Sequence, residues 1–306
     1  MPVKHFRSAK PLEFGAHVAL LAPAGPLQKP DDLARAQQNT RTLGWEPIVG
    51  SHATNRVGYL AGSDRDRLND INLALRDPKV DAIWCLRGGY GMMRILSGID
   101  YDSLSRAPKP IIGYSDITAL HAAIQRKCRL VTYHGPHSRE TMTDFSRDSF
   151  LRAVVEQTDS CGVAPDAREI NAGAAEGRLV GGNLAVLAAL CGTPFAPDLS
   201  DGILILEDIN EPVYRIDRML QQLVLSGALN GCRAIVFGQC VKCADDAGGG
   251  PRPFDEVLGE VAHSLGVPCL AGIPVGHIDE QWTIPLGAMA TLDTSARALN
   301  VTSYTS

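Results

Sequence analysis

The sequence predicts an α/β fold built on a parallel sheet that helices cover on both faces. Two observations support this prediction: short apolar runs alternate with segments of helical periodicity, and glycine-rich or polar loops stand between them. Strands that alternate with helices are typical of parallel sheets, because each crossover helix packs on a face of the sheet. The 306 residues, of which 45% are hydrophobic, are enough for two domains at roughly 150 residues each.

The first half of the chain shows this alternation. An apolar run at residues 17–23 is expected to form a buried strand, and apolar residues recur at helical spacing over 30–43. A second helix is expected to begin at Ser63, with Asp66 three residues later as its capping partner. The other elements expected in this half are strands at 80–86, 110–115 and 130–133 and a helix at 116–127.

A polar stretch of small residues divides the chain at 158–175. It is weakly periodic, and we therefore expect it to link an N-terminal domain of residues 1–157 to a C-terminal domain of residues 176–306. In the second domain we expect helices at 183–191, from 213 and at 254–265, strands at 202–208 and 233–238, a Gly- and Asp-rich loop at 244–250, and short strands with turns from 267.

Charge and hydropathy exclude two classes of protein. The net charge is −5, whereas a nucleic-acid-binding protein would usually show a basic face. The N-terminal segment lacks the apolar core of a signal peptide, and glycines and a proline interrupt the longest apolar stretch, 179–196. We therefore expect a cytoplasmic protein that binds neither nucleic acid nor a membrane.

The eight cysteines are scattered, and several lie inside apolar strands, where cysteine usually behaves as a small buried hydrophobic residue. In a cytoplasmic protein we expect their thiols to be reduced. Cys240 and Cys243 form the single CxxC motif, which has no second ligand pair and no histidine at zinc-finger spacing. We therefore expect no metal site, and no motif in the sequence indicates a cofactor.

The turn Gly113-Tyr114-Ser115-Asp116 joins an expected strand to an expected helix. A serine on such a sharp turn would project its hydroxyl above the sheet, and the start of the helix would offer unpaired N–H groups to an oxyanion. The alternative is that Ser115 or Asp116 only caps the helix.

A glycine-rich loop, RGGYG at 87–91, follows a neighbouring strand. Gly88 and Gly89 can bring backbone N–H groups close to an anion or a carbonyl oxygen. The loop has neither the Lys-Ser/Thr of a P-loop nor a GxGxxG pattern, so nucleotide binding is weakly supported. Ligands of open α/β sheets bind at the carboxyl ends of the strands, where both of these loops lie.

A nucleophilic serine needs a base, and the base needs a carboxylate that orients it. His277 is the candidate base, with His134 as its main competitor. Glu207 and Asp208 end an apolar strand, and only one of them can face the histidine because successive strand residues point to opposite faces. The order Ser, acid, His is that of the α/β-hydrolases, but the glycine two residues after their nucleophile is missing, and we reject that fold.

Several motifs occur in an order that resembles the LD-carboxypeptidases, serine peptidases that trim muropeptides during bacterial cell-wall recycling. The resemblance covers nearly the whole chain, from 20 to 288. Its motifs are RGGYG at 87–91, GYSDITAL at 113–120, HGP at 134–136, GGNL at 181–184, LEDINEPVYRIDRML at 206–220 and GH at 276–277.

The resemblance implies a role for each site residue. Ser115 matches the nucleophile, Glu207 the orienting carboxylate and His277 the general base. The backbone N–H groups of Gly89 and Asp116 would form the oxyanion hole. A further residue, Asn183, would line the substrate cleft.

The resemblance also implies the architecture and the reaction. It implies a flavodoxin-like N-terminal domain, a smaller C-terminal domain built mainly of strands, and a homodimer. The implied substrate is a muropeptide, whose terminal D-alanine would be released from the L-centre of lysine or meso-diaminopimelate without a cofactor. An exopeptidase must also bind the free carboxylate of its substrate. Arg87 can do so with two parallel hydrogen bonds, or it can instead cap a carbonyl or pair with an acid of the fold.

Two other functions stay open. A branch of the family that resembles microcin-immunity proteins cleaves a toxin similar to an acyl-adenylate, and such a protein would need an aromatic or arginine platform for the adenine. A non-catalytic ligand-binding protein could instead use Gly88 and Gly89 to hold an anion.

Overall fold

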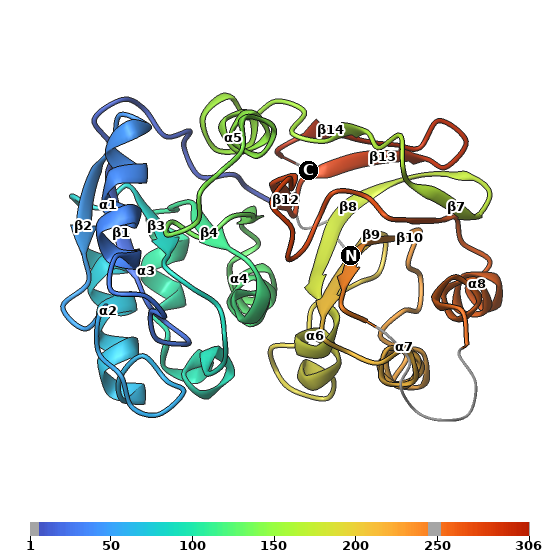
Figure 1. Ribbon diagram of the computed structural model, residues 1–306, viewed down its shortest axis with the longest axis horizontal. Coiled ribbons are helices and arrows are strands. Elements are labelled where there is room, and N and C mark those ends of the chain that lie inside the picture. The colour runs from blue at the N-terminus through green and yellow to red at the C-terminus, as the bar shows by residue number, and fades with distance from the viewer. Residues whose placement is uncertain (1–5, 244–251, 306) are drawn as a thin grey trace.

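Two β-sheets organise the chain, and helices pack against both of them (Figure 1). The computed structural model describes residues 6–243 and 252–305. The Gly- and Asp-rich loop expected at 244–250 therefore lies outside the described residues. Elsewhere the alternation of strands and helices agrees with the sequence, and the α/β prediction is confirmed.

The first sheet has the order β12-β5-β4-β3-β1-β2, in which β1 to β5 are parallel and β12 is antiparallel. The order 2-1-3-4-5 is that of flavodoxin-like folds. Residues of β1 alternate between two core clusters: Val18 and Leu20 join one, and Ala19 and Leu21 join the other. The strands are β1 (His17–Leu21), β2 (Glu46–Val49), β3 (Ala82–Cys85), β4 (Ile111–Gly113), β5 (Thr132–His134) and β12 (Ile284–Leu286).

The helices of the first half include one whose start the sequence identified. At α2, Ser63 Oγ accepts from the Asp66 N–H at 3.2 Å and the Asp66 carboxylate accepts from the Ser63 N–H at 3.1 Å, so the expected capping box is confirmed. In the described parts of the chain no helix is long and apolar enough to cross a membrane. The helices are α1 (Asp32–Thr42), α2 (Asp64–Arg76), η1 (Met92–Arg94), η2 (Leu96–Gly98), α3 (Tyr101–Arg106), η3 (Ser115–Ile117), α4 (Thr118–Cys128), α5 (Asp144–Leu151) and η4 (Arg152–Glu156).

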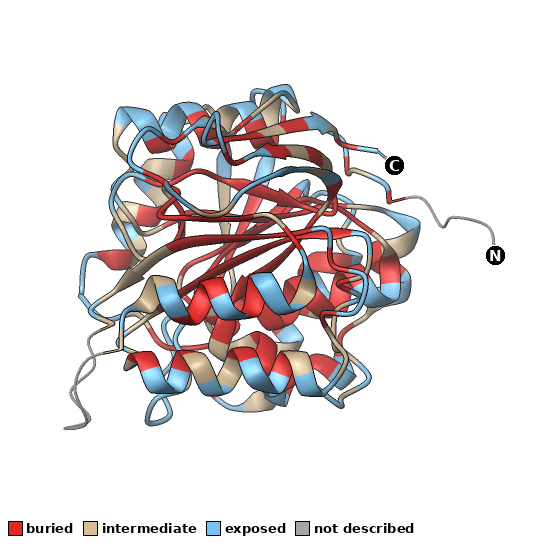
Figure 2. Ribbon diagram, turned by 90° about the vertical axis from the view of Figure 1, so that its right-hand side faces the viewer, coloured by how far each residue is buried: buried red, intermediate tan, exposed pale blue. Residues whose placement is uncertain are grey.

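The second sheet is mixed, with the order β6-β14-β13-β8-β9-β10-β11-β7. Strands β8 to β11 are parallel, and the antiparallel strands lie outside them. Figure 2 shows that its central strands are buried, while the helices expose one side and bury the other. The elements are β6 (Gly162–Val163), β7 (Arg168–Asn171), β8 (Ala174–Asn183), α6 (Leu184–Leu190), β9 (Gly202–Ile209), α7 (Val213–Leu225), β10 (Ala234–Val241), α8 (Phe254–Leu265), β11 (Cys269–Ala271), β13 (Met289–Asp293) and β14 (Ala298–Ser303).

The stretch 158–175, which the sequence suggested as a linker, contains β6 and β7 and the start of β8. Both short strands pair at the edges of the second sheet, β6 with β14 and β7 with β11. Their side chains are partly or fully exposed, and this is why the segment lacks an apolar pattern. The division at 157 and 176 stays a prediction.

The segment that follows His277 crosses from the second sheet to the first. Its strand β12 pairs with β5 at the edge of the first sheet, with Ile284 opposite His134. Helix α5 holds the crossing segment through two serines. Ser149 Oγ accepts from the buried Thr283 N–H at 2.9 Å, and Ser146 Oγ accepts from the Gln281 N–H at 2.8 Å.

The expectation of reduced thiols is wrong for one pair. A disulfide joins Cys240 to Cys243, because the turn at the end of β10 brings their Cα atoms to 5.5 Å, a separation typical of disulfides. The other six cysteines are free. Within 6–243 and 252–305, no three His, Cys, Asp or Glu side chains are placed to hold a metal ion.

Ser149→Ala tests the contact between α5 and the crossing segment. The change leaves the Thr283 N–H and the Ser160 carbonyl without this partner, and we expect the free energy of unfolding to fall by about 1–3 kcal/mol. Urea denaturation measures the effect. The matched control is Ser51→Ala, an exposed serine, for which we expect a change within about 0.5 kcal/mol. Equal stability of the two variants would contradict this account.

Candidate active site

Two loops meet at the carboxyl ends of the adjacent strands β3 and β4. The glycine-rich loop passes so close to the turn after β4 that a Cβ atom on Gly88 would lie 2.8 Å from the Cβ of Ser115 and 3.1 Å from its Oγ. A side chain at position 88 would therefore displace the serine. This close approach explains the glycine, and it brings the two predicted loops into one site.

Ser115 itself has a left-handed backbone, with φ of +62°. This conformation is uncommon for a residue with a side chain, and residues held in it are over-represented at active sites. Ser115 begins η3 and is partly exposed. Among the described residues, no side-chain hydrogen bond caps η3 or α4, so the geometry favours a sharp turn that presents the hydroxyl.

Asp116 ties the glycine-rich loop to this turn. Its buried Oδ2 accepts from the backbone N–H of Met92 at 2.8 Å. Burial raises the pKa of the Asp116 carboxyl to about 6, although this hydrogen bond and the charge of Arg67 lower it. The side chain therefore fixes the relative position of the two loops that carry Gly89 and Asp116.

His277 and Glu207 lie together in the second domain. The Nδ1–H of His277 donates to Glu207 Oε2 at 2.8 Å, and the Glu207 side chain is fully buried. Gly276 makes the contact possible, because a Cβ there would lie 3.1 Å from the Cβ of Glu207. Glu207, and not Asp208, is the acid that faces the histidine.

Asp208 points to the opposite face of β9 and serves the fold. Its carboxylate accepts from the backbone N–H groups of Ala185 at 2.9 Å and Ile209 at 2.8 Å, and from Asn183 Nδ2 at 3.2 Å. Burial, with the charge of Glu207, raises the pKa of Asp208 to about 6 despite these bonds. Asn183 also caps α6 by accepting from the Val186 N–H, and its place in a substrate cleft stays a prediction.

Tyr114 brings the two halves of the site together. Its ring packs against two histidines, with centroid distances of 4.3 Å to His137 and 4.9 Å to His277. Since Tyr114 directly precedes Ser115, His277 of the second domain packs beside the serine turn of the first. The sequence did not single out Tyr114, although its position in the turn was available.

His134 is a poorer candidate for a base than His277. It is completely buried, and neither ring nitrogen has a hydrogen-bond partner in the described part of the chain. Burial and the nearby His121, His277 and His137 hold its pKa well below the usual value. It therefore lacks a carboxylate that could orient it.

The pKa of His277 is raised. Burial lowers it, but the hydrogen bond to Glu207 and the charges of Glu207, Asp208 and Glu140 raise it by more. These carboxylates stabilise the imidazolium, which is the form that a histidine takes after accepting a proton. A histidine with this environment can act as a general base toward a neighbouring hydroxyl.

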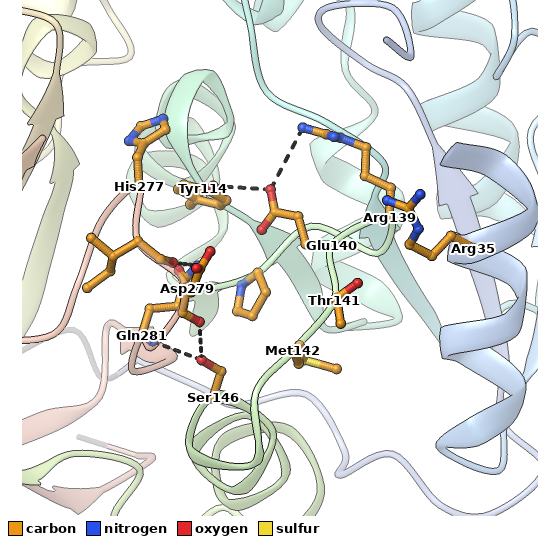
Figure 3. Close-up of a pocket in the computed structure, with 12 residues that line it drawn as sticks. Arg35, Tyr114, Arg139, Glu140, Thr141, Met142, Ser146, His277, Asp279 and Gln281 are labelled. Atoms are coloured by element: carbon orange, nitrogen blue, oxygen red, sulfur yellow. Dashed lines mark hydrogen bonds and ion pairs between the residues drawn. The ribbon is translucent and has the colours of Figure 1, made fainter. Parts of the chain in front are cut away.

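A cavity of about 310 Å³ opens beside His277 and Tyr114 (Figure 3). Its other walls come from α1, from the loop after β5, from the start of α5, and from the segment after His277. Arg139 and Glu140 of the loop after β5 line it, and sequence analysis missed both. That loop also follows a carboxyl strand end, so the rule that placed Ser115 could have found them.

Arg87 lies outside this cavity lining. Its Nη1 donates to the backbone carbonyl of Pro26 at 2.6 Å. Of the two alternatives left open for Arg87, the geometry matches the one in which it holds a carbonyl of the fold.

Two family models match the chain. One describes the LD-carboxypeptidase N-terminal domain and matches residues 18–135, and the other describes the LD-carboxypeptidase C-terminal domain and matches residues 176–292. Together they span more than half of the chain. It therefore belongs to the LD-carboxypeptidase family, as its motifs suggested.

Named relatives agree with this assignment. A probable murein peptide carboxypeptidase of Bacillus subtilis is 37% identical, over 94% of this chain and 92% of that protein. The structure of a muramoyltetrapeptide carboxypeptidase from Oxalobacter formigenes superposes with a TM-score of 0.81 at 32% identity, covering 94% of this chain and 98% of that one. The microcin C7 self-immunity protein MccF of Escherichia coli is 26% identical over 96% of this chain and 95% of that protein.

Glu207→Gln tests the electrostatic account of His277. The amide cannot supply the negative charge, so we expect the pKa of His277 to fall, as measured by NMR titration of its ring. Asp208→Asn removes a charge on the other face with no bond to the ring, and we expect a smaller fall. A larger fall in Asp208→Asn would contradict the assignment of Glu207 as the orienting acid.

Proposed function

We propose that the chain is a serine-type LD-carboxypeptidase that acts on muropeptide tetrapeptides in murein recycling. The bond that breaks joins the L-centre of a diamino acid to the terminal D-alanine. The proposal rests on one arrangement: His277 donates a hydrogen bond to Glu207, and its ring packs against Tyr114, which directly precedes the left-handed Ser115. The family and the names of the relatives support this substrate class.

In the first half of the reaction Ser115 Oγ attacks the carbonyl carbon of the L-centre. His277 accepts the hydroxyl proton at Nε2, because its Nδ1–H already donates to Glu207. The tetrahedral intermediate then collapses, and His277 returns the proton to the departing amine of D-alanine. An acyl-enzyme on Ser115 remains.

In the second half water hydrolyses the acyl-enzyme. His277 takes a proton from the water, the resulting hydroxide adds to the acyl carbon, and the proton returns to Ser115 Oγ as the peptide acid leaves. Each tetrahedral intermediate carries a negative oxygen, which the backbone N–H groups of Gly89 and Asp116 would stabilise. Removing one such donor typically lowers the rate by about 10²–10³-fold.

Cleavage of an acyl-adenylate toxin is the second candidate function. The similarity to MccF supports it, at 26% identity against 37% for the murein peptide carboxypeptidase. Incubation of the enzyme with a muropeptide mixture and with an aminoacyl sulfamoyl adenosine, followed by mass spectrometry, distinguishes the two.

The proposal includes a cytoplasmic homodimer that binds neither nucleic acid nor membranes. The disulfide between Cys240 and Cys243 argues against a cytoplasmic location, because disulfides are rare in the cytosol. The six free cysteines agree with that location. Cell fractionation tests the location, and sedimentation of the purified protein tests the dimer.

Ser115→Ala should abolish release of D-alanine from a tetrapeptide. Loss of a serine nucleophile lowers the rate by at least about 10⁴-fold, and the fold should be unchanged because the hydroxyl makes no cap. The measurement is D-alanine release together with circular dichroism. Near-normal turnover by the folded variant would rule out catalysis by Ser115.

The wild-type enzyme should cleave the L,D bond of a tetrapeptide and leave the D,D bond of the pentapeptide intact. Attack requires the carbonyl carbon about 3–3.5 Å from Ser115 Oγ, and inversion of the donor centre moves the chain out of that line. Comparison of kcat/KM for the two peptides checks this. Equal values would indicate a D,D-peptidase or an unselective hydrolase.

A further inference from the structure

Arg139 stands in the wall of the cavity that adjoins His277, on the loop after β5 (Figure 3). Its side chain is only 18% exposed. Two carboxylates are near it, yet both are beyond hydrogen-bond distance: Asp32 Oδ1 is 3.8 Å from Nη1, and Glu140 Oε1 is 3.9 Å from Nη2. Its buried Nε has no hydrogen-bond partner among residues 6–243 and 252–305.

Each of these carboxylates accepts hydrogen bonds from other groups, although Asp32 Oδ1, the oxygen that faces Arg139, accepts none among the described residues. Asp32 Oδ2 accepts from the backbone N–H groups of Gln28 and Lys29, each at 2.9 Å. Glu140 Oε1 accepts from the Tyr114 hydroxyl at 3.1 Å and from His137 Nδ1 at 3.0 Å. The guanidinium of Arg139 is therefore partly buried with two long ion pairs and no direct hydrogen bond to a carboxylate of the fold, and a ligand carboxylate could supply such charge-assisted bonds.

The loop holds this arginine in place before any ligand arrives. Asn39 Nδ2 on α1 donates to the carbonyl oxygens of Ser138 and Glu140, both at 2.7 Å. These two residues flank Arg139, so its backbone is fixed on both sides. A fixed backbone lowers the entropy that binding would cost.

Further positive charge surrounds the same place. Arg35 lines the cavity, and its Nη1 is 3.9 Å from the Asp32 oxygen that also faces Arg139. Arg87 is close enough that the charge of Arg139, added to burial, lowers its pKa. Three arginines therefore lie near one another, although Arg35 is paired with Asp31 and Arg139 faces Asp32 and Glu140. A ligand carboxylate beside Arg139 would lower the repulsion between the arginines.

We propose that Arg139 binds a carboxylate on one of the two residues that flank the scissile bond. This inference rests on the proposed LD-carboxypeptidase function. The carboxylate is that of the terminal D-alanine or the side-chain carboxylate of diaminopimelate at the third position. Arg139 takes the place that sequence reasoning considered for Arg87, whose guanidinium holds the Pro26 carbonyl.

The experiment compares four substrates: tetrapeptides with lysine or diaminopimelate at the third position, each ending in D-alanine or D-alaninamide. The variants are Arg139→Gln, which loses the charge, and Arg139→Lys, which keeps it but loses the paired donors. The control is Arg147→Gln, an exposed arginine on α5 whose partner is Asp144.

Arg139→Gln should lower kcat/KM by about 10- to 100-fold on each substrate that carries the bound carboxylate, as expected for a lost charged hydrogen bond. Arg139→Lys should recover part of the loss, and Arg147→Gln should match the wild type. A loss on both free acids but not on the amides assigns the terminal carboxylate. A loss on the diaminopimelate peptides alone assigns the side chain.

Substrates that keep their wild-type rate show that the variant is folded. An equal loss on all four peptides, or no loss on any, would overturn the role of Arg139. If the wild type releases D-alanine or D-alaninamide from none of the peptides, the proposed function fails instead, so the two failures are distinguishable.

Discussion

The pairing of β12 with β5 is the contact on which the site depends, because it joins the two sheets that share the chemistry. Ser115 follows a strand of the first sheet, whereas Glu207 and His277 belong to the second domain. Proton transfer across such a junction tolerates little movement, since a displacement of about 1 Å can lower a rate 10²-fold. Within a few residues of His277, at Ile284, the chain pairs with the first sheet. This short connection limits the movement of His277 relative to Ser115. A second link lies nearer the serine, where the Asn183 N–H donates to Thr118 Oγ1 at 3.0 Å.

The left-handed Ser115 also needs support, because such a conformation costs of the order of 1–3 kcal/mol. The support is local and comes from the loop before it. The backbone of Gly88 packs against Ser115, where a side chain would not fit. The Asp116 carboxylate accepts from the Met92 N–H at the end of the same loop. Asp116 thus both holds the turn and carries one backbone donor of the proposed oxyanion hole, and the other donor, Gly89, directly follows Gly88.

The sequence predicted the features of the fold and the site that depend on periodicity and on strand ends. It did not predict the features that depend on tertiary contacts. The buried strands and the capping box at Ser63 follow from local patterns. Two adjacent acids at the end of β9 could not be separated, because the choice depends on which face of the second sheet meets the first domain. The edge strands β6 and β7 were missed because exposed edges lack alternation. Arg139 was missed although its loop follows a strand end; the strand-end rule indicates the loop, but the long ion pairs of the Arg139 guanidinium are visible only in the packing.

The contrast between Glu207 and Asp208 explains how adjacent carboxylates come to serve different purposes. Asp208 accepts two backbone N–H groups and an amide, so its charge is satisfied in the resting protein. Glu207 is equally buried, but Oε1 has no hydrogen-bond partner in the described residues, and Oε2 faces only His277. The fold thus leaves Glu207 with one partner, and that partner gains positive charge when it accepts the serine proton. A carboxylate arranged in this way stabilises the transition state more than the resting state, which is the condition for catalysis by a preorganised charge.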